Sequence, residues 1–202
     1  MSPKRTVEQE IKFDVDALQP DAELDQIMHV SSLGDTTTME LDARYFDTPD
    51  LKLASNKITL RRRVGGKDAG WHLKTTGEHG REELQLPLGD SMEVPEALRK
   101  EVADIIGQDV LEEVARIHNR RVETLLIGAS GEVVAEFCDD HVNASSREHE
   151  QRWREWEVEL RDGALEAAQG EELLQSAAAV LLAQGAQKAA SASKLQRALG
   201  NH

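Results

Sequence analysis

The sequence predicts an α+β domain in which about eight antiparallel β-strands form most of the structure. Three observations support this fold class. Segments that alternate apolar and polar residues recur along the chain, glycine-rich turns join several of them, and helical segments interrupt the strands rather than alternating with them. Because no repeat and no break in composition divides the 202 residues, we expect a single domain over residues 1–202.

The first expected strand is residues 7–13, with the sequence VEQEIKF. Its odd positions are mostly apolar, and its even positions are Glu8, Glu10 and Lys12. Successive side chains of a strand point to opposite faces, so this strand has one apolar face and one charged face.

A helix and then an antiparallel meander are expected next. Apolar residues recur at roughly helical spacing over residues 16–30, where Asp21 is a candidate N-cap. Alternation and β-branched residues then predict four strands joined by glycine-rich turns, at residues 36–48, 55–64, 71–76 and 81–88.

The turn between the second and third of these strands contains Gly65, Gly66 and Lys67. Phosphate-binding P-loops also combine glycines with a lysine, but the full spacing of that motif is absent and no helix follows. We therefore interpret this segment as a hairpin turn.

The second half of the chain repeats the mixture of helix and strand. A proline in the first turn begins an expected helix over residues 94–106. Strand patterns follow at residues 114–127, 132–142 and 153–161. Residues 163–200 are rich in Ala, Leu and Gln and predict helix, with breaks near Gly185 and over residues 189–193.

Composition limits the class of partner. The 38 acidic residues outnumber the 24 Lys and Arg, for a formal net charge of −14, and so acidic a surface repels nucleic acid. The single cysteine rules out an internal disulfide and fits a reducing compartment. Since no signal-peptide core or membrane-length apolar run is present, we expect a cytoplasmic protein that binds neither nucleic acid duplexes nor membranes.

Nearly every expected strand pairs an apolar face with a face of charged residues. The charged faces carry Glu8, Glu10, Lys12, Arg61, Arg63, Lys74, Arg81, Glu83, Arg121, Glu136, Asp140, Glu155, Glu157 and Glu159. The last three form one row of like charges, which repel each other unless a cation lies against them.

These charged faces predict a tunnel. Carboxylate oxygens suit Mg²⁺ or Mn²⁺ rather than zinc, and the planar guanidinium of Arg matches phosphate oxygens. A closed sheet with its polar faces inward would form a tunnel with acidic and basic walls. Its apolar faces would then pack outward against the helices.

Seven motifs along the chain resemble those of the CYTH superfamily, also called triphosphate tunnel metalloenzymes. In family order they are ExExK at residues 8–12, YFDT at 45–48, LRRR at 60–63, WHLK at 71–74, RxE at 81–83, ExExE at 155–159 and SK at 193–194. The resemblance implies an eight-stranded antiparallel β-barrel, flanked by helices, whose tunnel binds a triphosphate and a divalent metal ion, Mg²⁺ or Mn²⁺.

The resemblance also implies roles for single residues. Phosphate oxygens would be bound by Lys12, Arg61, Arg63, Lys74, Arg81, Arg121 and Lys194, of which the first four would be catalytic. The metal would be bound by Glu8, Glu10, Asp140, Glu157 and Glu159, with Glu83 and Glu155 as further ligands. The alternation of the strands selects the same positions except Lys194, which rests on the motif alone.

The expected function is a metal-dependent hydrolase of a triphosphate, either inorganic tripolyphosphate or a nucleoside or thiamine triphosphate. Two alternatives stay open: a polyphosphate-binding module without turnover, and an adenylyl cyclase of class IV. The cyclase needs an adenine pocket, for which one Tyr and three Phe offer no candidate. The chain most resembles bacterial CYTH domains that precede a helical CHAD domain, so a CHAD domain or a second copy of the chain is a candidate partner.

Several other polar residues are interpreted as structural. His72 shares a face with Lys74 but is expected to be a satisfied buried histidine, and Cys138 a small buried side chain. The other histidines considered, His118, His141 and His149, are expected at the surface. Arg62 and Arg120 should face outward, although a bulge would exchange the roles of Arg120 and Arg121. The helix at 94–106 and the C-terminal helix could each close one mouth of the tunnel.

Overall fold

A computed structural model describes residues 4–77, 80–191 and 193–200. Among these residues one antiparallel sheet has the strand order β1-β6-β5-β4-β3-β7-β8-β9-β2-β10. The strands are β1 (Lys4–Glu8), β2 (Glu10–Val15), β3 (Ser32–Asp47), β4 (Thr59–Val64), β5 (Gly70–Gly77), β6 (Gly80–Pro87), β7 (Glu112–Ile127), β8 (Val133–Ser146), β9 (Glu150–Leu160) and β10 (Gln187–Lys188). The helices are α1 (Lys52–Ser55), α2 (Glu96–Glu101), α3 (Ala103–Ile106), α4 (Ala167–Ala183) and α5 (Lys194–Ala198).

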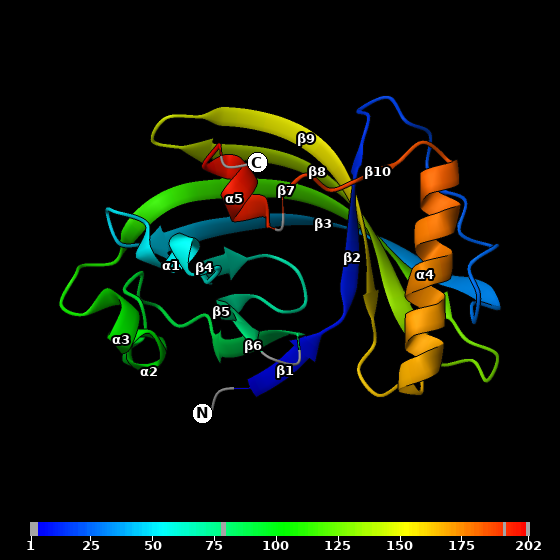
Figure 1. Cartoon of the computed structure of the whole chain (residues 1–202), viewed down its shortest axis with the longest axis horizontal. Coiled ribbons are helices and arrows are strands. Elements are labelled where there is room, and N and C mark those ends of the chain that lie inside the picture. The colour runs from blue at the N-terminus through cyan, green and yellow to red at the C-terminus, as the bar shows by residue number, and fades with distance from the viewer. Residues whose placement is uncertain (1–3, 78–79, 192, 201–202) are drawn as a thin grey trace.

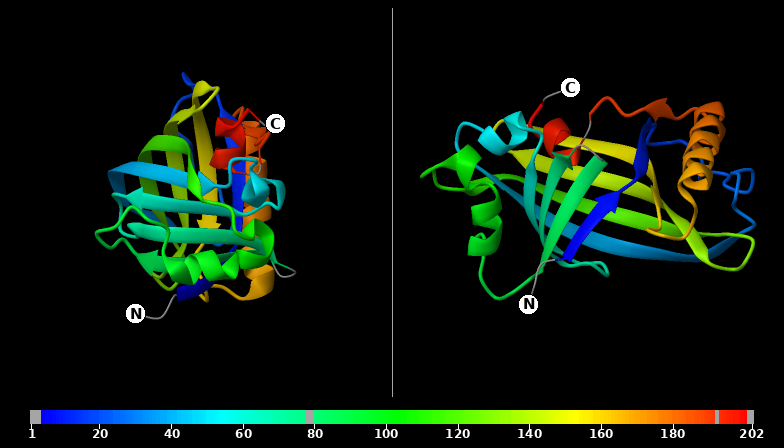
Figure 2. Two further views of the ribbon diagram at one scale, coloured as in Figure 1. Left: turned by 90° about the vertical axis from the view of Figure 1, so that its left-hand side faces the viewer. Right: turned by 60° about the horizontal axis from the view of Figure 1, so that its bottom comes forward.

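The sheet curls so that its two ends meet at the N-terminal segment (Figures 1 and 2). β1 pairs with β6 and β2 pairs with β9, yet only Gln9 separates β1 from β2. The ladder of backbone hydrogen bonds is therefore not a closed ring, and the chain itself bridges the gap. The expected antiparallel tunnel is confirmed, with the first expected strand split into β1 and β2 and a two-residue strand, β10, added.

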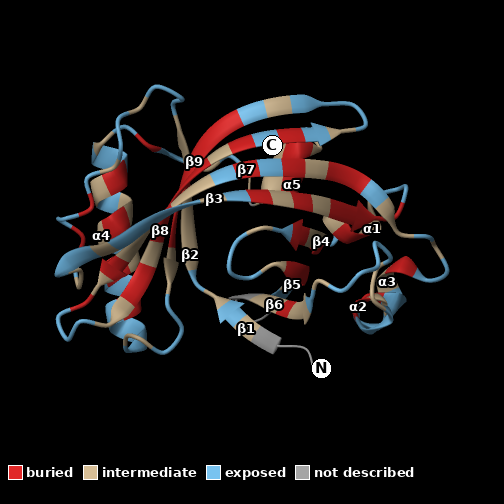
Figure 3. Cartoon of the chain, turned by 180° about the vertical axis from the view of Figure 1, so that it is seen from behind, coloured by how far each residue is buried: buried red, intermediate tan, exposed pale blue. Residues whose placement is uncertain are grey.

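The apolar faces of the strands point outward, as expected, and form three clusters beneath the helices. One lies under α4 and includes Trp156 and Leu173, a second lies under α5, and the third lies under α1, α2 and α3 and includes Trp71. The long strands β7, β8 and β9 accordingly mix buried with more exposed residues along their length (Figure 3). Burial of this apolar surface is the main favourable term in folding.

The prediction of a helix over residues 16–30 is wrong, because that segment has turns and no helix. Its backbone groups bond to side chains of α4 and the loop after it: Met28 N donates to Ser176 Oγ at 3.0 Å, and Glu23 N to Gln184 Oε1 at 2.8 Å. Leu24 and Ile27 are still buried against α4. Tertiary hydrogen bonds thus replace the helical ones that the apolar spacing predicted.

Two other helical predictions are corrected in detail. The helix expected at residues 94–106 is two short helices, α2 and α3, interrupted at Val102. Both pack on the outer face of β4–β6 rather than over a mouth of the tunnel. The C-terminal region is α4, the short strand β10 and α5, and only α5 places a side chain, Lys194, in the tunnel.

Several predictions about single segments and residues are confirmed. The segment with Gly65 and Gly66 is a hairpin turn between β4 and β5. His72 is fully buried, and both ring nitrogens have partners, Glu83 at 2.7 Å and the backbone oxygen of Asp68 at 3.0 Å. Cys138 is buried and Arg120 is exposed. None of the helices in the described part of the chain has the length and apolar character needed to span a bilayer.

Candidate active site: a charged tunnel

The inner compartment of the tunnel is a cavity of about 120 Å³ whose described lining is almost entirely charged. Six acidic and six basic side chains line it, together with one tyrosine. They are Glu8, Glu10, Lys12, Tyr45, Arg61, Arg63, Asp68, Lys74, Glu83, Arg121, Glu157, Glu159 and Lys194. Eleven of them were predicted from the sequence.

The three other predicted site residues lie elsewhere. Asp140 and Glu155 do not line the cavity, but both contact the Lys194 ammonium, Asp140 at 2.8 Å. Arg81 belongs to β6 opposite Glu8, and its side chain lies outside the described residues. Tyr45 and Asp68 line the compartment and were missed, although Tyr45 begins the YFDT motif.

We call one side of the tunnel the β4–β6 wall, formed by Arg61, Arg63, Lys74 and Glu83. Arg61 forms no ion pair with a described carboxylate, and its Nη1 donates only a long hydrogen bond, 3.4 Å, to Tyr45 Oη. The buried Nε atoms of Arg61 and Arg63 have no hydrogen-bond partner. Two guanidinium groups therefore face the cavity with donors left free, which suits an anionic ligand.

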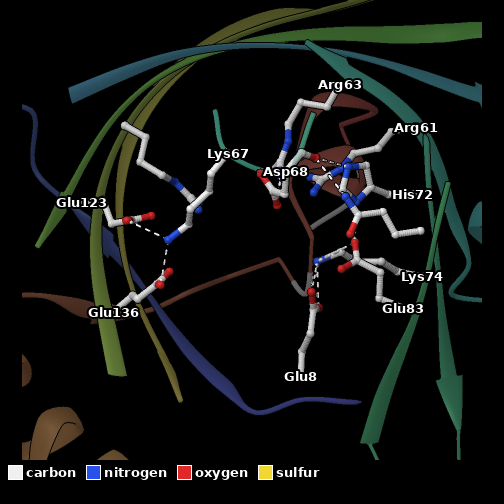
Figure 4. A network of polar contacts seen from close by, with 12 residues as sticks. Glu8, Arg61, Arg63, Lys67, Asp68, His72, Lys74, Glu83, Glu123 and Glu136 are labelled. Carbon is white, nitrogen blue, oxygen red and sulfur yellow. Dashed lines mark hydrogen bonds and ion pairs between the residues drawn. The ribbon is translucent and has the colours of Figure 1, made fainter. Parts of the chain in front are cut away.

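Charge repulsion within this wall supports the same conclusion. Burial, then the neighbouring guanidinium of Arg61, lowers the pKa of Arg63, while Asp68 partly offsets both. Lys74 is neutralised by Glu8, with Nζ to Oε1 and Oε2 distances of 2.6 and 2.7 Å. Glu83 is held by His72 (Figure 4). Of the three cations of the wall, Arg61 is the one without a described carboxylate partner.

We call the opposite side the β7–β9 wall, formed by Arg121, Asp140, Glu155 and Glu157 with Lys12 from β2 and Lys194 from α5. Arg121 donates two hydrogen bonds to Asp140, at 2.8 and 2.7 Å, and one to Glu157 at 2.7 Å. Glu157 also accepts from Lys194 at 2.7 Å and pairs with Lys12 at 2.9 Å. The sheet register imposes these contacts, since Arg121 lies opposite Asp140 and Lys12 opposite Glu157.

Two carboxylates of the β7–β9 wall, Asp140 and Glu157, are ionised because cations surround them, whereas burial raises the pKa of Glu155. Burial would raise the pKa of Asp140, but Arg121 and Lys194 lower it to about 2. Burial likewise opposes ionisation of Glu157, and Lys12, Lys194 and Arg121 lower its pKa well below the ordinary value. The expected cation against the glutamate row is thus partly the protein's own, supplied by lysine and arginine.

Glu159 differs from Glu155 and Glu157 in having no ion pair with a described cation. Burial together with Glu8 and Glu10 raises its pKa to about 7. Glu10 and Glu159 lie directly opposite each other on β2 and β9. A cluster of carboxylates with one member left unneutralised fits an added cation, and its oxygen-only donors match Mg²⁺ or Mn²⁺.

A second acidic cluster fits a metal less well. One carboxylate oxygen from each of Asp140, Glu155 and Glu157 lies within 4.8 Å of the others. The Lys194 ammonium contacts all three residues. A metal ion there would have to displace Lys194 from all three residues. A metal ion at Glu8, Glu10 and Glu159 would displace Lys74 and Lys12 but would meet no described cation at Glu159.

An outer chamber of about 370 Å³ continues the tunnel. It shares six lining residues with the inner compartment, including Arg63, Glu83 and Glu159. At its far side Lys67 Nζ lies 3.0 Å from Glu123 Oε1 and 2.7 Å from Glu136 Oε1, well apart from the Arg61 group (Figure 4). Neither Lys67 nor Glu123 was predicted as a site residue, and Glu136 was placed on a charged face without a role.

Comparison with known proteins identifies the fold and the family. A CYTH domain family model matches residues 7–198. Two uncharacterized proteins of Mycobacterium tuberculosis, from strains CDC 1551 / Oshkosh and H37Rv, are each 42% identical over 98% of this chain. The chain spans only 41% of the length of these relatives.

Solved structures share the fold at low identity. A candidate adenylate cyclase of Bacillus halodurans has a TM-score of 0.63 and 19% identity, covering 96% of this chain and 97% of its own. A Hippeastrum protein, a candidate adenylyl cyclase reported to have a dominant triphosphatase activity, has a TM-score of 0.52 and 18% identity, with 97% of both chains covered. At these identities the likeness establishes the arrangement of strands and helices.

Proposed function

The chain belongs to the CYTH domain family. On that premise we propose that it is a divalent-metal-dependent triphosphatase whose preferred substrate is inorganic tripolyphosphate. One observation carries the proposal. A single compartment holds the buried guanidinium of Arg61, which has no described carboxylate partner, and the carboxylate of Glu159, which has no described cation partner. A phosphate anion with its divalent metal satisfies both.

The β4–β6 wall would bind the phosphate oxygens first. Arg61 and Arg63 stand two residues apart on one face of β4, and the Nε atom of each is buried without a partner. Charge-assisted hydrogen bonds from guanidinium to phosphate are among the strong ones in proteins. Lys74, two residues from His72 on β5, would add a third cation once its partner Glu8 binds metal.

The metal would be held by Glu8, Glu10 and Glu159, with Glu83, Asp140, Glu155 and Glu157 as further proposed ligands. When bound, a divalent ion withdraws charge from phosphate oxygens and lowers the pKa of water. Loss of the Glu8 carboxylate to the metal would remove the closest partner of Lys74, and loss of Glu10 would remove one of the two partners of Lys12. Metal and phosphate would therefore strengthen each other's binding.

Hydrolysis then requires little covalent work from the protein. Water attacks the terminal phosphorus, the bond from that phosphorus to the bridging oxygen breaks, and phosphate and pyrophosphate leave. Arg61, Arg63 and Lys74 stabilise the negative charge on the equatorial and leaving oxygens, because their positions are fixed before the substrate arrives. Lys12, Arg121 and Lys194 would hold the remaining phosphates from the opposite wall.

The two other readings predict different products. A polyphosphate-binding module would need the basic residues but no metal chemistry, so the carboxylates that pair with Lys12, Arg121 and Lys194 argue against it. An adenylyl cyclase would use the same cations on a nucleoside triphosphate. A CHAD domain or a second copy of the chain stays a proposed partner.

Phosphate release from tripolyphosphate, ATP and thiamine triphosphate, each with Mg²⁺, Mn²⁺ or EDTA, tests the proposal. We expect metal-dependent release, fastest from tripolyphosphate, and complete loss with EDTA. Release that continues in EDTA would contradict the metal requirement. Tight binding of tripolyphosphate by calorimetry without any release would establish the binding module, and cyclic AMP formed from ATP would establish the cyclase.

A further inference from the structure

We propose that Glu123 and Glu136, held in place by Lys67, restrict the tunnel to short phosphate chains and exclude polyphosphates longer than tripolyphosphate. The inference rests on the proposed function, since it concerns the ligand of the same tunnel. It is carried by the outer chamber, whose charge and ion pairs differ from those of the inner compartment.

A phosphate chain that is longer than the inner compartment must enter the outer chamber. The two cavities share six lining residues and therefore lie side by side. On the other side, the next residues on the faces of Arg61 and Lys74 are Thr59 and Thr76, which line a separate and mostly apolar cavity whose one charged lining residue is Lys57. Among the described residues, the charged lining thus continues into the outer chamber.

The lining of the outer chamber carries a net negative charge, which disfavours an anion. Among the described residues, seven acidic side chains line it against four basic ones, whereas the inner compartment has equal numbers. The residues that the outer chamber adds include the carboxylates of Glu123, Glu136 and Asp162. Glu123 is only 6% exposed, so solvent screens its charge weakly.

The cations that the outer chamber adds are also already occupied. Lys67 bridges Glu123 and Glu136, and Arg161 contacts Glu136 from the end of β9. In the inner compartment, by contrast, Arg61 has no described carboxylate partner. Beyond Arg63, a fourth phosphate would therefore meet carboxylates and two described cations, Lys67 and Arg161, that already have carboxylate partners.

The turn that carries Lys67 is fixed in position. Gly65 has φ +86°, and a Cβ atom there would lie 2.1 Å from the backbone oxygen of Glu40 in β3. Gly66 has φ +74°, and its Cβ would lie 2.9 Å from Leu41 Cδ2. Only glycine allows this close approach. The two glycines thus hold the hairpin against β3 and set Lys67 between Glu123 and Glu136.

The test compares tripolyphosphate with tetrapolyphosphate and with a long-chain polyphosphate, read both as kcat/KM with Mg²⁺ and as Kd by calorimetry. We expect the wild-type protein to prefer tripolyphosphate by at least tenfold. In the double variant Glu123→Gln/Glu136→Gln, Lys67 is released and the carboxylates are neutral, so the ratio of tetrapolyphosphate to tripolyphosphate should rise about tenfold. Lys67→Met leaves the carboxylates without that cation and should lower the ratio about threefold.

Two surface variants with the same types of substitution serve as controls: Glu113→Gln, which removes a partner of Arg44, and Lys52→Met, which removes a partner of Asp109. Neither should move the ratio. A wild-type protein that takes long chains as well as tripolyphosphate would overturn the proposal, and so would a higher ratio in Lys67→Met. If no substrate is hydrolysed, the proposed function fails while the Kd ratios still decide this inference.

Discussion

The two walls of the tunnel are buried to a similar extent but differ in how their charges are paired. In the β7–β9 wall, Arg121 and Lys194 each contact Asp140 and Glu157. In the β4–β6 wall, Arg61 has a long hydrogen bond to Tyr45 and no described ion pair. The first wall is complete by itself, while the second is complete only with a ligand.

The difference shows which charges serve the fold and which serve a ligand. Buried charges without partners are costly, so they persist where something else gains from them. A buried charge destabilises the fold less when it has a partner. Removal of one partner is then strongly destabilising, because the other charge is left buried and unpaired. We therefore expect substitutions in the two walls to have opposite effects on stability and on activity.

The largest effect should come from breaking the paired wall. Arg121→Ala leaves Asp140, which is 0% exposed, without the cation that donates two hydrogen bonds to it. We expect the free energy of unfolding to fall by about 3–5 kcal/mol, measured by urea denaturation at pH 7. Arg120→Ala, at the neighbouring exposed position, should change it by no more than about 0.5 kcal/mol. Equal stability of the two variants would mean that the β7–β9 wall does not support the fold.

The next effect should appear in activity. Arg61→Ala removes a donor aimed at the phosphate, so kcat/KM for tripolyphosphate should fall by about 10²–10³-fold. Its free energy of unfolding should stay within about 1 kcal/mol of the wild type or increase, because a buried charge without a described carboxylate partner is lost. Arg62→Ala, on the opposite face of β4, should keep most of the activity. A large loss of stability in Arg61→Ala would show that the two walls are not different in kind.

The sequence alone predicted which faces of the strands turn inward. Glu8, Glu10 and Lys12 all line the inner compartment, because their shared parity survives the break at Gln9 between β1 and β2. Each strand has only two faces. Once the odd or the even positions are correctly assigned to the inner face, every charged residue along the strand is placed. The closure of the sheet followed from the same reasoning.

The pairing of the charges could not be predicted from the sequence. Which carboxylate neutralises Arg121 depends on the register of β7 against β8, and which one neutralises Lys194 depends on how α5 docks. Lys67 lies in a turn, where alternation gives no direction, and its partners are more than 50 residues away. The helix at residues 16–30 failed for the same reason, because side chains of α4 and the loop after it, far along the chain, satisfy its backbone.

Glu159, which lies on β9 opposite Glu10 and has no described cation partner, provides the smallest expected effect. Its pKa is raised from 4.5 to about 7, first by burial and then by Glu8 and Glu10. A carboxyl group that binds its proton more tightly when folded destabilises the protein above the folded pKa, and this penalty disappears as the pH falls from 7 toward 4.5. In EDTA, Glu159→Gln should therefore be more stable than the wild type by about 1–3 kcal/mol at pH 8, with little difference at pH 5.

Added Mg²⁺ should reverse the order at pH 8, since the metal occupies the carboxylates that the proton otherwise neutralises. Urea unfolding at both pH values, with and without metal, measures all four differences, and Glu113→Gln on the surface should show none of them. A stability difference that is the same at pH 5 and pH 8 would mean that Glu159 titrates normally. In that case the cluster of Glu8, Glu10 and Glu159 has no unneutralised charge, and the metal would have to bind against the β7–β9 wall in place of Lys194.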